Sequence, residues 1–252
     1  AACHNVSTPQ GANQELYARI FTSLHLKTFK NIQVFSDYQK DLLLRKYPNK
    51  QVLNAPLALK DYGNVQKERH FDDKEIVFLF FGKILGYKRV DWLIKASQSL
   101  YEKGYSNFKI KIAGNCKNWN DYEQLIRYPE LFETKIGYIP NDSIAELFGS
   151  SDYFVMPYQD IAQSGAIMVA YRYNIPIILS DLPQFLPYGK DGETGFFFKK
   201  DSLEDLENVM AKLLDGGFLL NSHLRQGLTE FVRKRFSTEA IVAKYMIFFN
   251  KL

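Results

Sequence analysis

Two lysines that lie close together in the sequence, Lys83 and Lys88, could do chemistry on an anionic group. They follow the apolar run Ile76–Phe81 in a short loop that opens with Gly82. An ammonium group binds phosphate as a point charge, and a pair of them can stabilise the negative charge that develops when a diphosphate leaves. An isolated lysine pair is more often only a solvated loop. The pattern therefore needs a second element beside it.

The second element is a glycine-containing turn. A polar loop runs from the end of the apolar run Tyr153–Met156 into a helix that is expected to begin near Ser164 and Gly165. The N-terminus of a helix presents unpaired N–H groups and the positive end of the helix dipole, and both favour anions, phosphate especially. Ser164, Gly165 and Ala166 would offer backbone N–H groups to such an anion.

A regular alternation of strands and helices places both elements. Ile76–Phe81 is six apolar residues in a row, which is typical of a parallel strand covered on both faces. Between 108 and 112 apolar residues alternate with lysines, which predicts a strand with a more exposed face. Further strands are predicted at Tyr153–Met156 and 177–179. The pattern predicts an α/β fold with a Rossmann-like, doubly wound parallel sheet over 71–235, whose ligands bind at the carboxyl ends of the strands.

Capping residues predict where several helices begin. Ser143 and Glu146 have the spacing of a capping box, so a helix is expected to start at this point. Apolar residues recur at helical spacing behind Ser202, and two final helices are expected at about 218–235 and 238–250.

The chain divides into three parts. The first 59 residues carry short strands and helical segments, and the polar, aperiodic stretch 61–75 is interpreted as an interdomain linker. We therefore expect a partial N-terminal domain with its linker at 1–70, a larger domain at 71–235, and a C-terminal helix at 236–252. The chain begins with Ala rather than Met, and we expect it to be part of a longer protein.

Composition narrows the class of protein. The 252 residues are 46% apolar and 24% charged, with a net charge of +4, which suits an acidic ligand or a membrane face but is too weak for nucleic acid. Two cysteines, Cys3 and Cys116, cannot form a disulfide framework, so a reducing, cytoplasmic compartment is expected. The histidines show no metal-ligand spacing. No apolar run nears the roughly 18 residues that span a bilayer.

Five segments in order are similar to family-4 glycosyltransferases of the GT-B fold (glycosyl transferases group 1), and they cover most of 76–215. These segments are FGKILGYKRVDWLIKAS, KIAGN, KIGYIPNDSIAELFGSSDYFVMPY, QSGAIMVAYRYNIPIILSD and DGETGFFFKKDSLEDL. The resemblance implies transfer of a hexose-type sugar, with retention of configuration, from a nucleoside-diphosphate sugar to a glycan or lipid-linked acceptor, as in polysaccharide biosynthesis. It implies no metal and no further cofactor, because two lysines and a helix terminus supply the charge that a divalent ion would otherwise bring.

The resemblance also assigns donor-binding residues. Lys83 and Lys88 occupy the positions of an Arg and a Lys that grip the donor diphosphate, and the replacement by Lys keeps the charge but loses the bidentate fork. Tyr138 and Ile139 lie in a loop that resembles the one against the nucleotide base. The family's two glutamates around the glycine turn correspond to Ala162 and Ala170, so both carboxylates are absent.

The side chains left to hydrogen-bond the sugar are therefore those of Asp160, Gln163 and Ser164. The first 59 residues resemble the end of the acceptor-binding domain, which makes His4 the residue beside the reacting sugar and the predicted catalytic group. The final helix Thr238–Phe249 resembles the one that crosses back onto that domain.

Two alternatives remain open. The missing carboxylates favour a non-catalytic homologue that binds a nucleotide sugar or assists a partner enzyme, whereas Lys83 and Lys88 favour the transferase. A nucleotide-sugar epimerase of the same fold is disfavoured, because the sequence indicates no carboxylate-rich cleft for the acid–base chemistry that it would need. A peripheral contact with the inner face of the membrane through Arg233, Lys234 and Arg235 is also left open, although three surface charges are ordinarily only solubilising.

Overall fold

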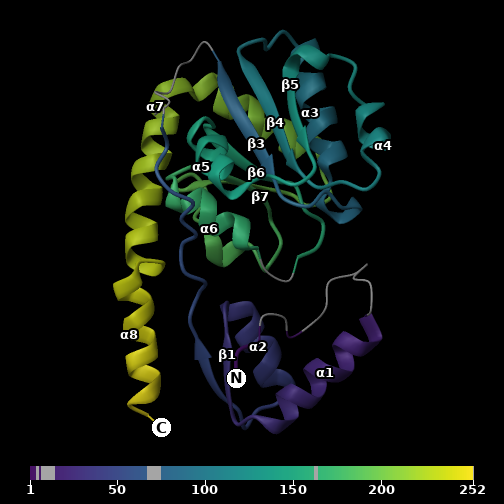
Figure 1. Ribbon diagram of the computed structural model, residues 1–252. Helices are drawn as coiled ribbons and strands as arrows, with labels where there is room; N and C mark the ends of the chain where they lie inside the picture. The colour runs from purple at the N-terminus through teal and green to yellow at the C-terminus, as the bar shows by residue number, and fades with distance from the viewer. Residues whose placement is uncertain (4–5, 7–14, 67–74, 162–163, 252) are drawn as a thin grey trace.

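The computed structural model describes residues 1–3, 6, 15–66, 75–161 and 164–251 as two α/β units and a final helix that joins them (Figure 1). The larger unit is built on six parallel strands in the order β5-β4-β3-β6-β7-β8. Their bounds are β3 Ile76–Phe81, β4 Phe108–Gly114, β5 Phe132–Ile136, β6 Tyr153–Met156, β7 Ile177–Ser180 and β8 Gly195–Phe198. The predicted doubly wound parallel sheet is confirmed.

The order of the strands identifies where this sheet can bind a ligand. Counted along the chain from β3, it is third, second, first, fourth, fifth and sixth, which is the order of dinucleotide-binding domains. The direction of winding reverses between β3 and β6, which pair through Phe78 with Tyr153 and Leu79 with Phe154. In open α/β sheets the ligand crevice lies outside the carboxyl ends of the strands at such a reversal.

Helices cover the sheet on both faces. In Figure 1, α5 and α6 lie in front of the sheet and α3 lies behind it. The central strands are fully covered, and the rings of Phe78 and Tyr153 stack with their centroids 5.4 Å apart. Burial of one such side chain stabilises the fold by roughly 1.5–3 kcal/mol. The bounds are α3 Val90–Glu102, α4 Trp119–Glu123, α5 Asn141–Gly149, α6 Gly165–Arg172 and α7 Leu203–Arg235, with short 3-10 turns at Gly86–Lys88, Pro129–Leu131 and Leu186–Tyr188.

Two predicted helix starts have different outcomes. Ser202 caps α7 as expected, because its Oγ accepts a hydrogen bond from the Asp205 N–H at 3.1 Å. The capping box at Ser143 is wrong. The Ser143 N–H donates to the Pro140 carbonyl at 3.0 Å, so Ser143 already lies in the first turn of α5 and cannot cap it. Within α7, Gly217 leaves helical geometry (φ 51°, ψ −144°) and separates the predicted final helix at 218 from the one before it.

The smaller unit carries β1 Asn31–Val34 and β2 Gln51–Asn54, paired in parallel, with α1 Glu15–Thr28 and α2 Asp37–Lys46. The helix α8, Thr238–Phe249, lies alongside this unit (Figure 1). The Gln33 side-chain amide donates to the Tyr245 hydroxyl at 2.6 Å. The last helix therefore contacts the N-terminal unit rather than the larger sheet. The predicted boundary at residue 71 lies outside the described residues.

The segment that follows β2, residues 57–66, packs against the larger unit. Leu57, Leu59 and Tyr62 pack against the core of the larger unit. Val65 packs against Gly149, and the Gln66 N–H donates to the Glu146 carboxylate. The first part of the stretch interpreted as a linker is thus docked on the sheet domain.

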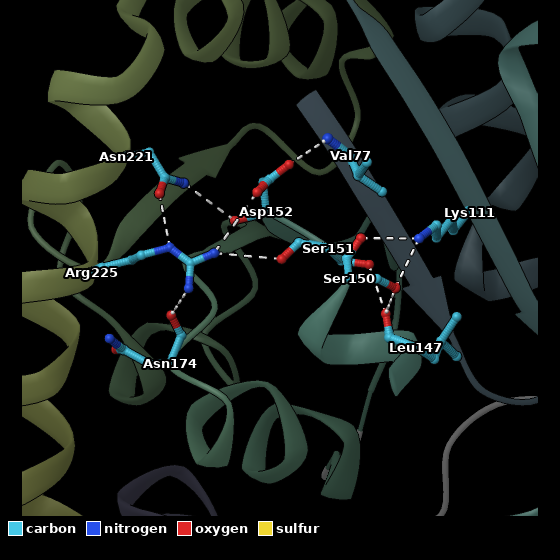
Figure 2. A network of polar contacts seen from close by, with 9 residues as sticks. All are labelled: Val77, Lys111, Leu147, Ser150, Ser151, Asp152, Asn174, Asn221 and Arg225. Carbon is cyan, nitrogen blue, oxygen red and sulfur yellow. Dashed lines mark hydrogen bonds and ion pairs between the residues drawn. The ribbon is translucent and has the colours of Figure 1, made fainter. Parts of the chain in front are cut away.

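A buried polar network ties β3, β6 and α7 together (Figure 2). The Asp152 side chain, 1% exposed, accepts a hydrogen bond from the Val77 N–H at 2.8 Å and lies 4.0 Å from the Arg225 guanidinium. Arg225 also donates to Asn221 Oδ1 and to the Asn174 carbonyl. A buried charge is tolerated only when it is paired and hydrogen-bonded, and this network satisfies both conditions.

We predict that Asp152→Ala lowers the free energy of unfolding by about 3 kcal/mol, because it leaves the buried Val77 N–H without its acceptor and the Arg225 charge without its nearby carboxylate. Urea denaturation followed by circular dichroism measures the change. Arg233→Ala is the control, since Arg233 pairs with Glu230 on the surface and should change stability little. A loss at Asp152 no greater than that at Arg233 would contradict the proposed role of the network.

Candidate functional site

The structure brings the two predicted elements together at the reversal of the sheet. Lys83 and Lys88 follow β3, and Ser164 and Gly165 follow β6, the strand that pairs with β3. All four residues therefore lie at the carboxyl edge of two adjacent strands. This is the position at which the fold favours a ligand.

Direct contacts join the two loops. The Gln159 N–H donates to the Tyr87 carbonyl at 2.7 Å, and the Tyr87 and Tyr158 rings are perpendicular with their centroids 6.1 Å apart. The Lys88 Nζ lies 4.9 Å from the centroid of the Tyr158 ring. Lys88, from the first loop, is thus held against the second loop by an attraction between its cation and the face of that ring.

The environment of Lys88 disfavours its charged form. Burial, together with a smaller effect of the positive charge of Lys83, lowers its pKa from 10.5 to about 8. Lys83 itself is exposed. The two ammonium groups repel each other, so an anion bound beside both would lower their electrostatic energy.

Two glycines allow the ends of β3 and β4 to lie close together. Gly82 (φ 129°) follows β3 and Gly114 (φ 145°) ends β4, and both have backbone angles that only glycine adopts without strain. A side chain on Gly114 would lie 2.0 Å from the Gly82 carbonyl oxygen. One on Gly82 would lie 3.4 Å from the Lys88 Nζ. The Lys88 ammonium therefore lies directly against Gly82.

The turn after Lys88 is held in an unusual conformation. Arg89 is left-handed (φ 49°) although it is not a glycine. Its guanidinium donates to both carboxylate oxygens of Asp91 at 2.9 and 2.8 Å and lies 4.2 Å from the Trp92 ring centroid. A left-handed conformation costs roughly 1–2 kcal/mol in such a residue, so these contacts fix the turn that carries Lys88. Sequence analysis missed them, although the Arg-x-Asp spacing was visible.

The second loop ends in a capped helix. Ser164 is 8% exposed, and its Oγ accepts a hydrogen bond from the Ala166 N–H at 3.3 Å at the start of α6. Of the three predicted backbone donors, Ala166 is therefore already engaged by the cap. Gly165 has another neighbour that the sequence did not reveal: a side chain built on it would lie 2.9 Å from the Nζ of Lys60.

The other predicted residues are more widely spread. The negative charge of Asp160 adds to burial in raising the pKa of Tyr87, which places this carboxylate near the first loop. Tyr138 is 79% exposed after the edge strand β5, and Ile139 packs against the core. His4 and Gln163 lie outside the described residues. Tyr158, 2% exposed, packs beneath Lys88 rather than facing solvent.

The sequence profile of one family, described as Glycosyl transferases group 1, matches residues 62–235. The chain belongs to the group 1 glycosyltransferases. A curated relative, the sulfoquinovosyl transferase SQD2 of Arabidopsis thaliana, is 26% identical over 110 residues, which are 42% of this chain and 21% of the plant protein.

Solved structures of similar fold cover nearly the whole chain. A TarM variant from S. aureus, in a complex that includes UDP, superposes with a TM-score of 0.79 at 17% identity, covering 99% of this chain and 50% of TarM. Sucrose-phosphate synthase from Thermosynechococcus elongatus gives a TM-score of 0.75 at 17% identity, covering 96% of this chain and 64% of that protein. These likenesses show the GT-B type of fold. This group 1 glycosyltransferase chain spans about half the length of TarM.

The basic cluster near the end of α7 is largely paired. Arg233 and Lys234 both contact the Glu230 carboxylate at 2.8 Å. In the part of the chain that the structure describes, no helix is both long and apolar enough to cross a membrane. No group of three or more His, Cys, Asp or Glu side chains within the described ranges is placed to hold a metal ion.

The lowered pKa of Lys88 implies that the thermal stability of the protein depends on the charge of this residue. Its pKa in the folded state is about 8, below the ordinary value of 10.5. Below pH 8 the amine is charged in both states and its full destabilising effect is present. This destabilisation decreases as the pH rises from 8 toward 10.5. We expect Lys88→Met to raise the Tm at pH 7 by several degrees, since about 1 kcal/mol shifts the Tm of a domain this size by roughly 2–4 °C. The gain should vanish above pH 10.

Differential scanning calorimetry at pH 7 and pH 10.5 provides the measurement. Lys83→Met is the matched control. Lys83 is exposed and is the smaller cause of the lowered Lys88 pKa, so this substitution should raise the Tm much less than Lys88→Met. A lower Tm for Lys88→Met at pH 7 would show that Lys88 stabilises the fold and is not held there at a cost.

Proposed function

We propose that this chain carries the donor-binding half of a family-4 type glycosyltransferase. It would transfer a hexose-type sugar from a nucleoside-diphosphate sugar to a glycan or lipid-linked acceptor, with retention of configuration. The observation that carries the proposal is the mostly buried ammonium of Lys88, fixed at the reversal of the sheet against the loop that leads into α6. Membership of the group 1 family supports it.

The geometry suits a diphosphate leaving group. As the bond from the sugar C1 to the phosphate oxygen breaks, its electron pair passes to that oxygen. The acceptor hydroxyl oxygen forms the new bond to C1, and its proton passes to the departing diphosphate. Lys88 and Lys83 would bind the phosphoryl oxygens from one side, and the start of α6 would bind them from the other. Positive groups already in place where negative charge develops are an effective way to lower such a barrier.

Recognition of the sugar nucleotide differs from the pattern that the sequence resembles. Ala170 stands where a glutamate would contact the ribose hydroxyls, and it is fully buried within α6. We infer that hydrogen bonds to the donor hydroxyls come instead from Asp160, Gln163 and Ser164. No metal is assigned to the site, because the lysines and the helix terminus would supply the neutralising charge.

A second candidate is a homologue that binds a nucleotide sugar without transferring it. Ala170 is the observation that favours it, since no carboxylate replaces the lost one at this position of α6. The two functions separate in one assay on the full-length gene product. Release of UDP or GDP from a sugar nucleotide in the presence of acceptor supports transfer, whereas tight binding without release supports the second candidate.

We predict that Lys88→Ala weakens UDP or GDP binding by about 1.5–3 kcal/mol, the contribution of a charge-assisted hydrogen bond. Isothermal titration calorimetry at pH 7 measures it. Affinity of the unsubstituted protein should also fall as the pH rises past about 8, because Lys88 loses its proton there. UDP is the first ligand to test, since the similar TarM structure contains it.

The control is Lys135→Ala. Lys135 is exposed on the edge strand β5, in a part of the sheet away from the reversal. If neither nucleotide binds, or if Lys88→Ala and Lys135→Ala bind equally well, the proposed function is wrong.

A further inference from the structure

A third lysine stands at the start of α6, and it comes from neither of the loops considered so far. Lys60 belongs to the segment between β2 and β3. Its Nζ and Cε lie 2.9 and 3.3 Å from where a side-chain carbon on Gly165 would be. Lys60 therefore occupies the space that glycine leaves open at the first residue of the helix.

The backbone of Lys60 is fixed to the helix that its side chain reaches. The Lys60 N–H donates to the Met168 carbonyl at 3.3 Å, in the middle of α6. The next residue, Asp61, forms an ion pair with Arg172 at 2.8 Å, at the other end of the same helix. The segment thus runs along α6, and the Lys60 side chain extends toward its N-terminus.

Hydrogen bonds continue this attachment beyond Asp61. The Tyr173 hydroxyl accepts from the Tyr62 N–H at 3.1 Å and donates to the Gly63 carbonyl at 3.0 Å. Leu59 and Tyr62, on either side of Lys60, pack against the core. The position of Lys60 relative to α6 is therefore set by several independent contacts.

The carboxylate nearest in sequence does not neutralise Lys60. One oxygen of Asp61 accepts from the Gly63 N–H at 2.8 Å and the other from Arg172, and both bonds lower the pKa of the carboxyl. Within the described ranges, no carboxylate forms an ion pair with Lys60. Its solvent-exposed ammonium lies instead beside the positive end of a helix dipole, where an anion would be attracted by both.

We propose that Lys60 is a third phosphate-binding cation of the donor site, acting on the diphosphate of the sugar nucleotide. This inference rests on the proposed function. Lys83 and Lys88 approach the site from the loop after β3, whereas Lys60 approaches the start of α6 from the segment that connects the two units. A diphosphate with two to three negative charges would then be bound by three ammonium groups and the helix N-terminus.

Three variants test the role of Lys60 by titration with UDP at pH 7. We expect Lys60→Ala to weaken UDP binding about 10-fold, which corresponds to about 1.4 kcal/mol. Lys60→Arg should retain affinity within about threefold because it keeps the charge. Lys135→Ala is the matched exposed lysine and should bind UDP as the unsubstituted protein does.

Uridine distinguishes phosphate binding from a structural role. It lacks phosphate, so Lys60→Ala should bind uridine as tightly as the unsubstituted protein; an equal loss for uridine and UDP would show that the substitution only disturbs the site. If Lys60→Ala binds UDP normally while Lys88→Ala does not, this inference is overturned and the proposed function stands. If both variants bind UDP normally, the proposed function fails as well.

Discussion

The pairing of β3 with β6 is the constraint on which the rest of this structure depends. These strands are neighbours in the sheet but are separated in the chain by two other strands, so the chain winds outward in opposite directions from them. The loops that follow them must diverge from a common edge. Because the Tyr87 carbonyl and the Gln159 N–H join these loops directly, the lysine loop and the glycine turn are held in one arrangement before any ligand binds.

That arrangement concentrates positive charge, which lowers the stability of the folded state. Lys88 is mostly buried with the Lys83 ammonium nearby. Its charge weakens the folded state until an anion binds, and the binding free energy then includes the relief of that repulsion. Stability comes from elsewhere in the domain. The stacked rings of Phe78 and Tyr153 and the buried hydrogen bond from the Val77 N–H to the Asp152 carboxylate hold the same strands, β3 and β6, together.

Much of this could be predicted from the sequence, because continuous apolar runs mark buried parallel strands and the site follows from where those strands end. Local signals were less reliable. The capping box at Ser143 failed because Pro140 begins the helix earlier. Lys60 could not be predicted at all, since nothing in its neighbours indicates that the segment would lie along α6. The left-handed Arg89 is likewise fixed by contacts with Asp91 and Trp92 that the fold creates.

The docking of residues 57–66 on the sheet domain determines where the two units can rotate relative to each other. The Ala55 N–H still bonds to the Val34 carbonyl of the smaller unit, while Leu57 already packs in the larger one, so the pivot of this crossing is confined to Pro56. In the return crossing, Phe236 belongs to the larger core and α8 begins at Thr238. Pro56 and Phe236 line the same small hollow. Both crossings thus share one location, and any rotation of one unit relative to the other would pivot at that location.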